Sequence, residues 1–400
     1  MSKPAKMVLA GILVCVLGAD PASTAEKENV ISQRERDYAR INEAAEKLKA
    51  RQMQVEAKEV KVRGGLPNFF AKANSGKPVV IAYFGGSITA HPGWRPQSFK
   101  AIQEMFPQSK MTMVNASVGG TGSVVGAFRA DNDLIKHRPD LVFIEFAVND
   151  GSSAVRDPTK IWRAQEGIVR KLRKSKPDTD ICFFYTMQGG HLETLRKGFC
   201  YSAVAVHEQM ASFYNLPSLY VGPAVRDAID RGEAVFSAKV ADRTTGKDAD
   251  GKLVITEDGT HPVIPTGHAF YARVAERGIK TMNNGDAPRV HELPTPMMVD
   301  HWEKAKTIPV HGNATFTGKW EKLTAEDGPY GFRFGKRIYE WFPFLYRTAS
   351  PGSSFTVKFR GTHVGFKGVG GPDSGFLKTK VDDQPETERC VFSVYNTRHA

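Results

Sequence analysis

The chain has 400 residues, of which 41% are hydrophobic and 24% are charged, and its formal net charge is +12. This length exceeds the needs of one small domain, and the composition excludes a globally disordered chain. A positive net charge can favour binding to nucleic acid, membrane headgroups or acidic polysaccharide. Because no dense block of Lys and Arg is present, we expect a soluble basic surface and no nucleic-acid partner.

The first 25 residues are typical of a signal peptide. Lys3 and Lys6 precede an apolar run from Met7 to Ala19, and Ser23-Thr24-Ala25 places small residues where a signal peptidase cleaves. The run is too short to span a bilayer, and no other long apolar stretch follows, so we expect no transmembrane segment. We therefore predict a secreted or periplasmic protein.

Residues 26–60 are rich in charged residues and carry apolar side chains at helical spacing. The pattern predicts an N-terminal charged helix, which either lies on the main domain or pairs with another chain. The oligomeric state stays open.

Residues 61–285 alternate short apolar strands with amphipathic helices. The expected strands are Pro78–Phe84, Lys110–Asn115, Leu141–Val148, Asp180–Thr186 and Pro217–Val221. Expected helices between them include Thr159–Lys174 and Leu192–Tyr214. Apolar strands that alternate with helices predict an α/β domain whose parallel sheet is covered on both faces.

Residues 286–305 contain Pro288, Pro294 and Pro296 and are interpreted as a linker. Residues 306–400 alternate turn residues with short aromatic-rich strands, which predicts a smaller all-β, sandwich-like accessory domain. Its expected strands are Arg333–Phe344, Ser354–Arg360, Val364–Lys367, Leu377–Val381 and Cys390–Tyr395. Its aromatic side chains could form a core or bind carbohydrate.

Cysteines are few. Removal of the signal peptide would leave Cys182, Cys200 and Cys390, and an odd number argues against a disulfide framework, although one disulfide remains possible.

Two glycine-rich segments follow the first two expected strands of the α/β domain. Gly85-Gly86-Ser87-Ile88-Thr89 places Ser87 near a helix start, where a serine can be a nucleophile or simply a cap. Residues 115–122 form a glycine loop whose N–H groups could face an oxyanion or a phosphate. Neither GxxxxGK[ST] nor GxGxxG is present, so we do not expect a nucleotide.

Two further segments carry polar side chains suited to acyl transfer. Asn149 ends the third strand and offers uncharged N–H donors to an oxyanion, although an Asn-Asp turn would look the same. Downstream, Asp258 and His261 lie three residues apart, so one loop can carry both. Asp258 can orient the His261 imidazole, whose other nitrogen can take a serine proton.

In order, these four segments resemble the four blocks of the SGNH (GDSL-type) hydrolase superfamily over roughly residues 76–280. The resemblance implies a flavodoxin-like three-layer α/β/α fold. It implies Ser87 as nucleophile, completed by Asp258 and His261, in a mechanism that needs no metal or organic cofactor. It also implies an oxyanion hole from the Ser87 and Gly120 amides and the Asn149 side chain, with Gly119 as the alternative to Gly120.

The first block departs from the common pattern, because it has Gly-Gly-Ser-Ile-Thr in place of Gly-Asp-Ser, and Ala147 stands in the third block where many members have glycine. The first departure resembles a GGSIT-type branch of exported enzymes thought to deacetylate polysaccharides. We therefore predict a serine esterase that removes acyl groups, acetyl above all, from a carbohydrate. The alternatives are a lipid or aryl esterase of the same fold, and a polysaccharide-binding protein with a vestigial hydrolase domain.

Three further residues, Trp94, Arg95 and His268, lie near the blocks. Trp94 could stack on a sugar ring and Arg95 could meet an acidic substituent, although packing alone would also explain Trp94. We expect His268 to support the helix after the triad. Asp250-Gly251 predicts a hairpin turn, because a calcium loop would need a carboxylate where Gly246 stands.

Overall fold

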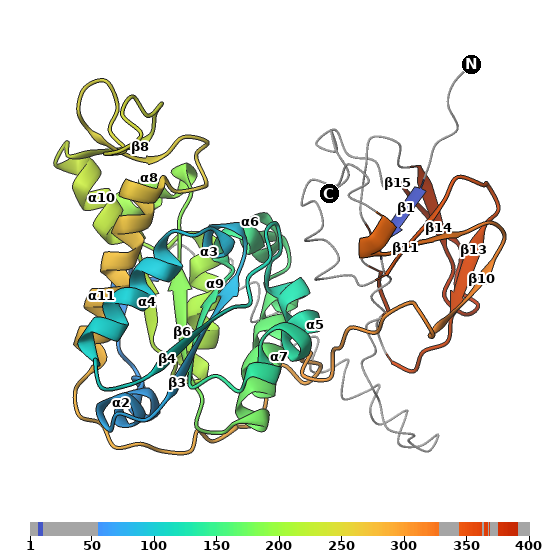
Figure 1. The fold of residues 1–400 in the computed structure, drawn as a ribbon, viewed down its shortest axis with the longest axis horizontal. Helices are drawn as coiled ribbons and strands as arrows, with labels where there is room; N and C mark the ends of the chain where they lie inside the picture. Colours follow the sequence, from blue (N-terminus) through green and yellow to red (C-terminus); the bar gives the residue numbers. More distant parts are fainter. Residues whose placement is uncertain are drawn as a thin grey trace. The chain divides into compact units, whose positions relative to one another are not determined.

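The computed structural model describes residues 7–10, 55–327, 344–361, 364–366, 368 and 375–390 (Figure 1). The chain divides into two compact units, one of Pro21–Glu303 and one of Met1–Asp20 with Lys304–Ala400. Most of the predicted signal peptide, most of the helix expected over residues 26–60, and the strand expected at Arg333–Phe344 lie outside the described residues, apart from residues 7–10, 55–60 and 344.

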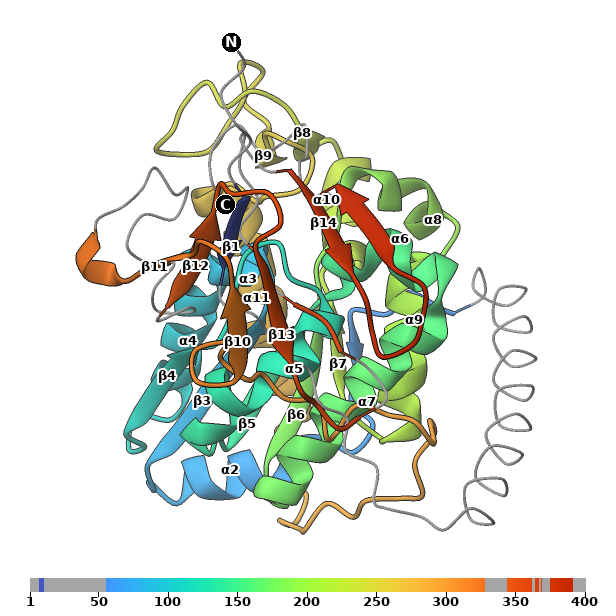
Figure 2. The same ribbon diagram turned by 90° about the vertical axis from the view of Figure 1, so that its right-hand side faces the viewer.

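The first unit is built on a six-stranded sheet in the order β2-β7-β6-β5-β3-β4. Its strands are β2 (Val60–Lys61), β3 (Val79–Gly85), β4 (Met111–Asn115), β5 (Leu141–Glu145), β6 (Asp180–Tyr185) and β7 (Ser218–Tyr220). All neighbours are parallel except β2, which runs antiparallel to β7. Figure 2 shows the parallel strands in the order β4, β3, β5, β6, β7. This is the flavodoxin-like order, which confirms the predicted fold class.

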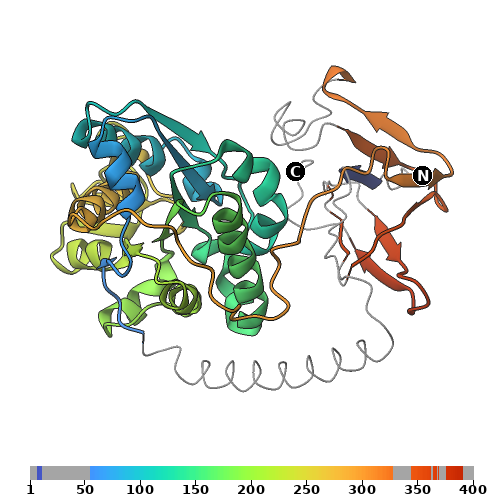
Figure 3. The same ribbon diagram turned by 90° about the horizontal axis from the view of Figure 1, so that it is seen from below.

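Helices cover both faces of the sheet, as the continuous apolar strands predict. Every residue of β5 and β6 is buried. One helical layer contains α4 (Trp94–Met105) and α11 (Ala269–Met282), which pack on each other. The other layer contains α5 (Ser123–Asp133), α7 (Pro158–Ser175) and α9 (Ser202–Phe213) (Figures 1 and 3).

The helix predicted over Leu192–Tyr214 is interrupted. It forms α8 (Leu192–Arg196) and α9, and the break contains Gly198 with a φ of +83°. The chain at residues 55–57 bonds to this break, because the Cys200 amide donates to the Val55 carbonyl at 2.7 Å. A distant segment therefore overrides the local helical periodicity.

The strand predicted over Leu141–Val148 is also shorter than expected. It ends at Glu145, and α6 (Ala147–Arg156) begins two residues later. Asn149 therefore lies in the first turn of a helix rather than on the strand.

Residues 286–303, which the sequence assigns to a linker, belong to the first unit and lie against α7. The Glu166 carboxylate accepts the amide N–H groups of Met297 and Met298 at 2.7 and 2.6 Å. Trp302 is 5% exposed, and a Cβ at Gly167 would lie 2.5 Å from its backbone carbon. These contacts hold this proline-containing segment in place on the helix.

The second unit contains small antiparallel sheets, as an all-β domain predicts. The pairs are β10 (Ala314–Thr317) with β13 (Ser354–Val357), and β14 (Phe376–Thr379) with β15 (Thr387–Cys390). A three-stranded sheet joins β1 (Met7–Ala10), β12 (Leu345–Thr348) and β11 (Glu321–Leu323). Residues 364–366, expected in a strand, form none. Phe316, Trp320 and Phe355 pack around the buried Val310, so these aromatic side chains contribute to a core.

Cys182 and Cys200 are both buried free thiols. Within the described residues, no helix combines the length and the apolar character that crossing a bilayer requires.

Candidate active site

The turn that carries Ser87 is closely packed on its neighbours. β3 ends at Gly85, and the short helix α3 (Ser87–Ala90) begins after Gly86. A Cβ at Gly85 would lie 2.6 Å from the Glu145 carbonyl oxygen, and a Cβ at Gly86 would lie 1.9 Å from Asn149 Oδ1. Gly85 is therefore required by its close approach to main chain, whereas Gly86 approaches the end of an exposed side chain.

The structure brings the three residues of the predicted triad together at the carboxyl edge of the sheet. Ser87 Oγ lies 2.8 Å from His261 Nε2, and His261 Nδ1 lies 2.6 Å from Asp258 Oδ2. Asp258 and His261 come from the loop after β9 (Leu253–Thr256), where Gly259 adopts a φ of +79°. One tight turn thus presents both side chains to Ser87.

The surroundings of Asp258 favour its ionised form. Partial burial would raise its pKa, but hydrogen bonds from the His261 ring and from the His261 and Thr260 amides lower this pKa to about 2. An ionised Asp258 favours the His261 tautomer with its proton on Nδ1. Nε2 is then free to accept the proton of Ser87.

The expected oxyanion-hole residues lie around the same turn. The exposed Asn149 side chain reaches Gly86, immediately before Ser87. A Cβ at Gly119 would lie 3.6 Å from Ser87 Cβ, and Gly120 follows with a φ of +72° and open space on its Cβ side. The loop after β4 and the start of α6 therefore both approach the turn that carries Ser87.

Three residues that sequence reasoning missed hold these loops together. Asp150 is buried, and its carboxylate accepts the Ser123 amide at 2.8 Å and contacts His207 Nε2 at 2.9 Å. Arg129 donates to the carbonyls of Ala116 and Gly85, at the ends of β4 and β3. Asp150 could have been suspected from its place beside Asn149. Arg129 and His207 have no local sequence signal.

The predicted substrate contacts at Trp94 and Arg95 are wrong. Trp94 is 0% exposed, and its ring stacks on Phe184 at 4.0 Å between centroids. Arg95 is 8% exposed, and its Nε donates to the Thr89 carbonyl at 3.0 Å. Both residues lie in the first turn of α4, which packs against the sheet, so their side chains point into the unit.

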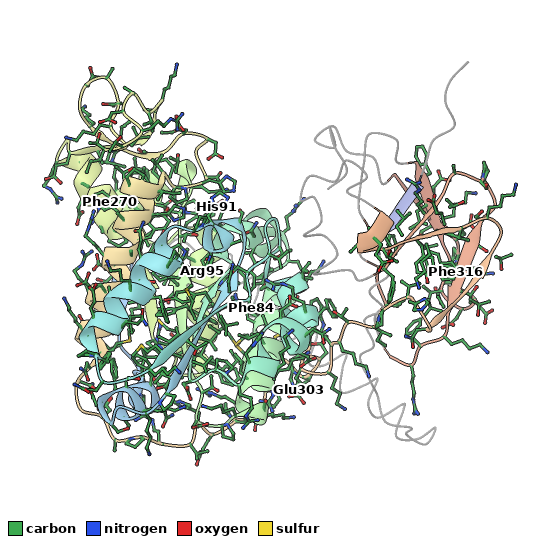
Figure 4. The ribbon with its side chains drawn as sticks, viewed as in Figure 1. Phe84, His91, Arg95, Phe270, Glu303 and Phe316 are labelled. Atoms are coloured by element: carbon green, nitrogen blue, oxygen red, sulfur yellow. The ribbon has the colours of Figure 1, made fainter. Side chains whose placement is uncertain are left out.

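His268 and the missed residue His91 lie beside the triad. His268 is fully buried and its Nδ1 accepts the Trp94 amide, while burial, His91 and His261 lower its pKa to about 3. His268 is therefore neutral and structural, as expected. His91, labelled in Figure 4, is exposed. Its ring stacks on that of His261, with centroids 5.5 Å apart and planes 23° apart. Burial and the neighbouring His261 lower the pKa of His91.

No metal site is formed by the part of the chain that the structure describes, where His, Cys, Asp and Glu do not gather in groups of three. At the predicted hairpin turn, Asp248 Oδ1 accepts the amides of Asp250 and Lys252 at 3.1 and 2.8 Å. Gly251 has a φ of +80°. The Asp248 carboxylate therefore stabilises this turn, and the turn predicted at Asp250-Gly251 is confirmed.

The sequence of the chain was compared with protein families and with curated proteins. The model of the GDSL-like lipase/acylhydrolase family matches residues 83–262. The sequence matches none of the curated proteins with which it was compared.

Several solved structures are similar in fold. A two-domain esterase active on acetylated mannans, co-crystallised with mannopentaose, is 24% identical over 69% of this chain and 67% of its own, with a TM-score of 0.46. A catalytic mutant of an acetylxylan esterase from Geobacillus stearothermophilus is 20% identical over 50% of this chain and 94% of its own, with a TM-score of 0.36. A lipase/acylhydrolase from Enterococcus faecalis is 17% identical over 51% of this chain and 96% of its own, with a TM-score of 0.36.

Proposed function

We propose that this chain is a serine esterase that removes acetyl groups from a carbohydrate. The match of residues 83–262 to the GDSL-like lipase/acylhydrolase family model supports ester hydrolysis as its reaction. One observation carries the mechanism. Ser87, His261 and Asp258 form a continuous hydrogen-bonded chain, with contacts of 2.8 and 2.6 Å, at the edge of the sheet where α/β enzymes bind ligands.

In the first step, His261 Nε2 takes the proton of Ser87 Oγ as this oxygen attacks the ester carbonyl carbon. The carbonyl oxygen gains negative charge, which the Ser87 and Gly120 amides and the Asn149 side chain stabilise. The ionised Asp258 stabilises the imidazolium that forms at His261. His261 then gives its proton to the leaving alcohol, and the acyl group stays on Ser87.

In the second step, water replaces the alcohol. His261 takes a proton from this water, whose oxygen attacks the acyl carbon, and the same donors stabilise the second oxyanion. Collapse of the intermediate releases the acid and returns the proton to Ser87. Every group in both steps is a side chain or amide of the first unit.

The carbohydrate substrate is supported by the GGSIT motif and by the openness of the site. The His261 and Asp258 side chains are 38% and 55% exposed, so an acetyl group carried on a bulky glycan can reach the triad. The predicted signal peptide suits an extracellular polymer. A lipid or aryl esterase is the alternative within the same mechanism, and the hydrogen-bonded triad argues against a vestigial hydrolase domain.

The test is acetate release from a panel of acetylated glycans, including acetylated mannan and acetylated xylan, with p-nitrophenyl esters of increasing acyl length as comparison. We expect acetylated glycans to be turned over and Ser87→Ala to abolish the reaction. Turnover restricted to long acyl esters would exclude the carbohydrate substrate. Undiminished turnover by Ser87→Ala would exclude the serine mechanism.

A further inference from the structure

We infer that Glu145 is a positioning residue that holds the nucleophile turn, Gly86–Thr89, by hydrogen bonds at both of its ends. This inference rests on the proposed function, because it concerns the placement of the proposed nucleophile Ser87. Glu145 is the last residue of β5 and none of its surface is exposed.

The two hydrogen bonds of Glu145 bracket Ser87. Its main-chain carbonyl accepts the Gly86 amide at 3.3 Å, and its Oε2 accepts the Thr89 hydroxyl at 2.8 Å. Gly86 precedes Ser87, and Thr89 follows it by two residues. A single residue of the sheet therefore fixes the turn on either side of the reacting oxygen.

The direction of the Thr89 bond follows from the other contacts of this hydroxyl. Thr89 Oγ1 accepts the indole N–H of Trp94 at 3.3 Å, so its own proton is directed to Glu145. The second carboxyl oxygen of Glu145 contacts the Thr186 hydroxyl at 2.8 Å. The carboxyl group thus joins the nucleophile turn to the end of β6 through two buried hydroxyls.

Within the described residues, Glu145 shares with Glu166 the lack of an ion pair, whereas several other buried carboxylates of this unit each have a cation as a partner. Asp140, Asp180 and Glu208 each pair with Lys, Arg or His within 2.9 Å. Among the described residues, no cationic side chain forms an ion pair with Glu145. A buried acid without a cation lowers stability, so ion pairing does not explain why a carboxyl group stands here.

The electrostatic surroundings of Glu145 favour its neutral form. Beside the two threonine hydroxyls, the groups that face it are the buried Tyr271 of α11 and the Asp150 carboxylate of α6. Burial is the main cause that raises the pKa of Glu145 to about 7. A neutral acid accepts from Thr89 with one oxygen and donates to Thr186 with the other, so both bonds persist in either protonation state.

The test compares Glu145→Leu with Glu145→Gln in the full chain, using a soluble acetyl ester. Leu removes both carboxyl oxygens and keeps the main-chain carbonyl, so the turn loses its side-chain anchor at Thr89. We expect kcat to fall about 10- to 100-fold with KM within about threefold, because a displacement of about 1 Å can cost about 10²-fold in rate. Gln is expected to restore kcat, since its amide oxygen accepts from Thr89 and its NH₂ group donates to Thr186. Unchanged kcat in Glu145→Leu would overturn the inference.

A matched pair of variants keeps the inference testable if Glu145→Leu does not fold. Thr89→Val and Thr186→Val each remove one buried hydroxyl from the same carboxyl group, but only Thr89 belongs to the nucleophile turn. We expect Thr89→Val to lower kcat, Thr89→Ser to restore it, and Thr186→Val to leave it within about twofold of the wild type. Equal losses in the two Val variants would assign Glu145 a purely structural role and overturn the inference.

Ser87→Ala, assayed in parallel, separates this inference from the proposed function. Activity that survives in Ser87→Ala would refute the serine mechanism itself. Loss of activity in Ser87→Ala, together with full activity in Glu145→Leu and Thr89→Val, would refute only the role of Glu145. The rate at which a fluorophosphonate labels Ser87 gives a second readout, and we expect it to fall in parallel with kcat.

Discussion

Replacement of Gly86 by alanine should remove one oxyanion donor without unfolding the protein. A Cβ at this position would lie 1.9 Å from Asn149 Oδ1 and 2.9 Å from its Cγ. The backbone of Gly86 has a φ of −90° and a ψ of −154°, so it does not adopt the positive φ that favours glycine over alanine. Asn149 is exposed, so its carboxamide can move towards solvent. The clash is therefore relieved by displacing Asn149.

The expected size of the effect follows from the proposed role of Asn149. Loss of one oxyanion donor costs about 10²–10³ in kcat, or about 3–4 kcal/mol of transition-state stabilisation. The free energy of unfolding, measured with urea, should change by less than about 1 kcal/mol because the displaced side chain is on the surface. Gly85→Ala is the contrasting variant. Its Cβ would meet the Glu145 main chain at 2.6 Å, which cannot move aside, so we expect it to lower stability.

A double-mutant cycle decides whether Asn149 transmits the effect. If Gly86→Ala acts by displacing Asn149, then Asn149→Ala and the double variant should have nearly the same kcat on an acetyl ester. Losses that multiply, giving about 10⁴ or more in the double variant, would refute the reasoning and indicate that the new methyl group obstructs the substrate directly.

The remaining predictions concern stability and the histidine side of the triad. The raised pKa of Glu145 means that the folded state holds its proton more tightly, so the contribution of this carboxyl group to stability is fully present below about pH 4.5 and is lost as pH rises through about 7. Glu145→Gln should therefore gain about 3 kcal/mol over the wild type at pH 8.5 in urea unfolding and nothing near pH 4, and an equal gain at both pH values would contradict this origin. Asp258→Asn should lower kcat about 10⁴-fold across the assay range, because the low pKa of Asp258 keeps it ionised throughout; a loss confined to acid pH would count against its role. Trp94→Ala should cost about 3–5 kcal/mol of stability through a core cavity, whereas a raised KM at unchanged stability would restore the sugar-stacking interpretation. His91→Ala should lower kcat about three- to tenfold by freeing the His261 ring, and His91→Phe should retain the stacked ring and the rate. Equal rates in the wild type and both variants would exclude a role of this contact in catalysis.

The order of the elements and the residues of the candidate site could be predicted because their signals are local. Continuous apolar strands followed by glycines indicate a parallel sheet, and parallel strands bring their carboxyl ends to one edge. Ser87 and Asn149 follow two such strands, so the sheet itself brings them together. Asp258 and His261 share one turn, and only their meeting with Ser87 depended on the resemblance to a known family.

The errors arose where a side chain could face either the sheet or solvent, or where a segment distant in sequence determines the local structure. Trp94 lies close to Ser87 in the chain, but the first turn of α4 faces the sheet, and no periodicity across a single turn reveals that. The break after α8 depends on hydrogen bonds from residues 55–57. The prolines of residues 286–303 indicated a linker, but Glu166 of α7 binds the backbone of this segment.

The same distinction explains why the supporting residues were missed while the residues of the proposed triad could be named. A nucleophile or a catalytic histidine must reach solvent, so the chain presents it in a short exposed turn with glycines around it. Glu145, Arg129 and His207 are buried and act across 40 to 60 positions of sequence, where each looks like an ordinary member of a strand or helix. Of these three residues, Glu145 alone has a local sequence signal, because it is a glutamate in an otherwise apolar strand and burial of a carboxyl group is costly. In a parallel α/β sheet, such a residue next to a glycine-rich strand exit is a candidate for holding the turn that reacts.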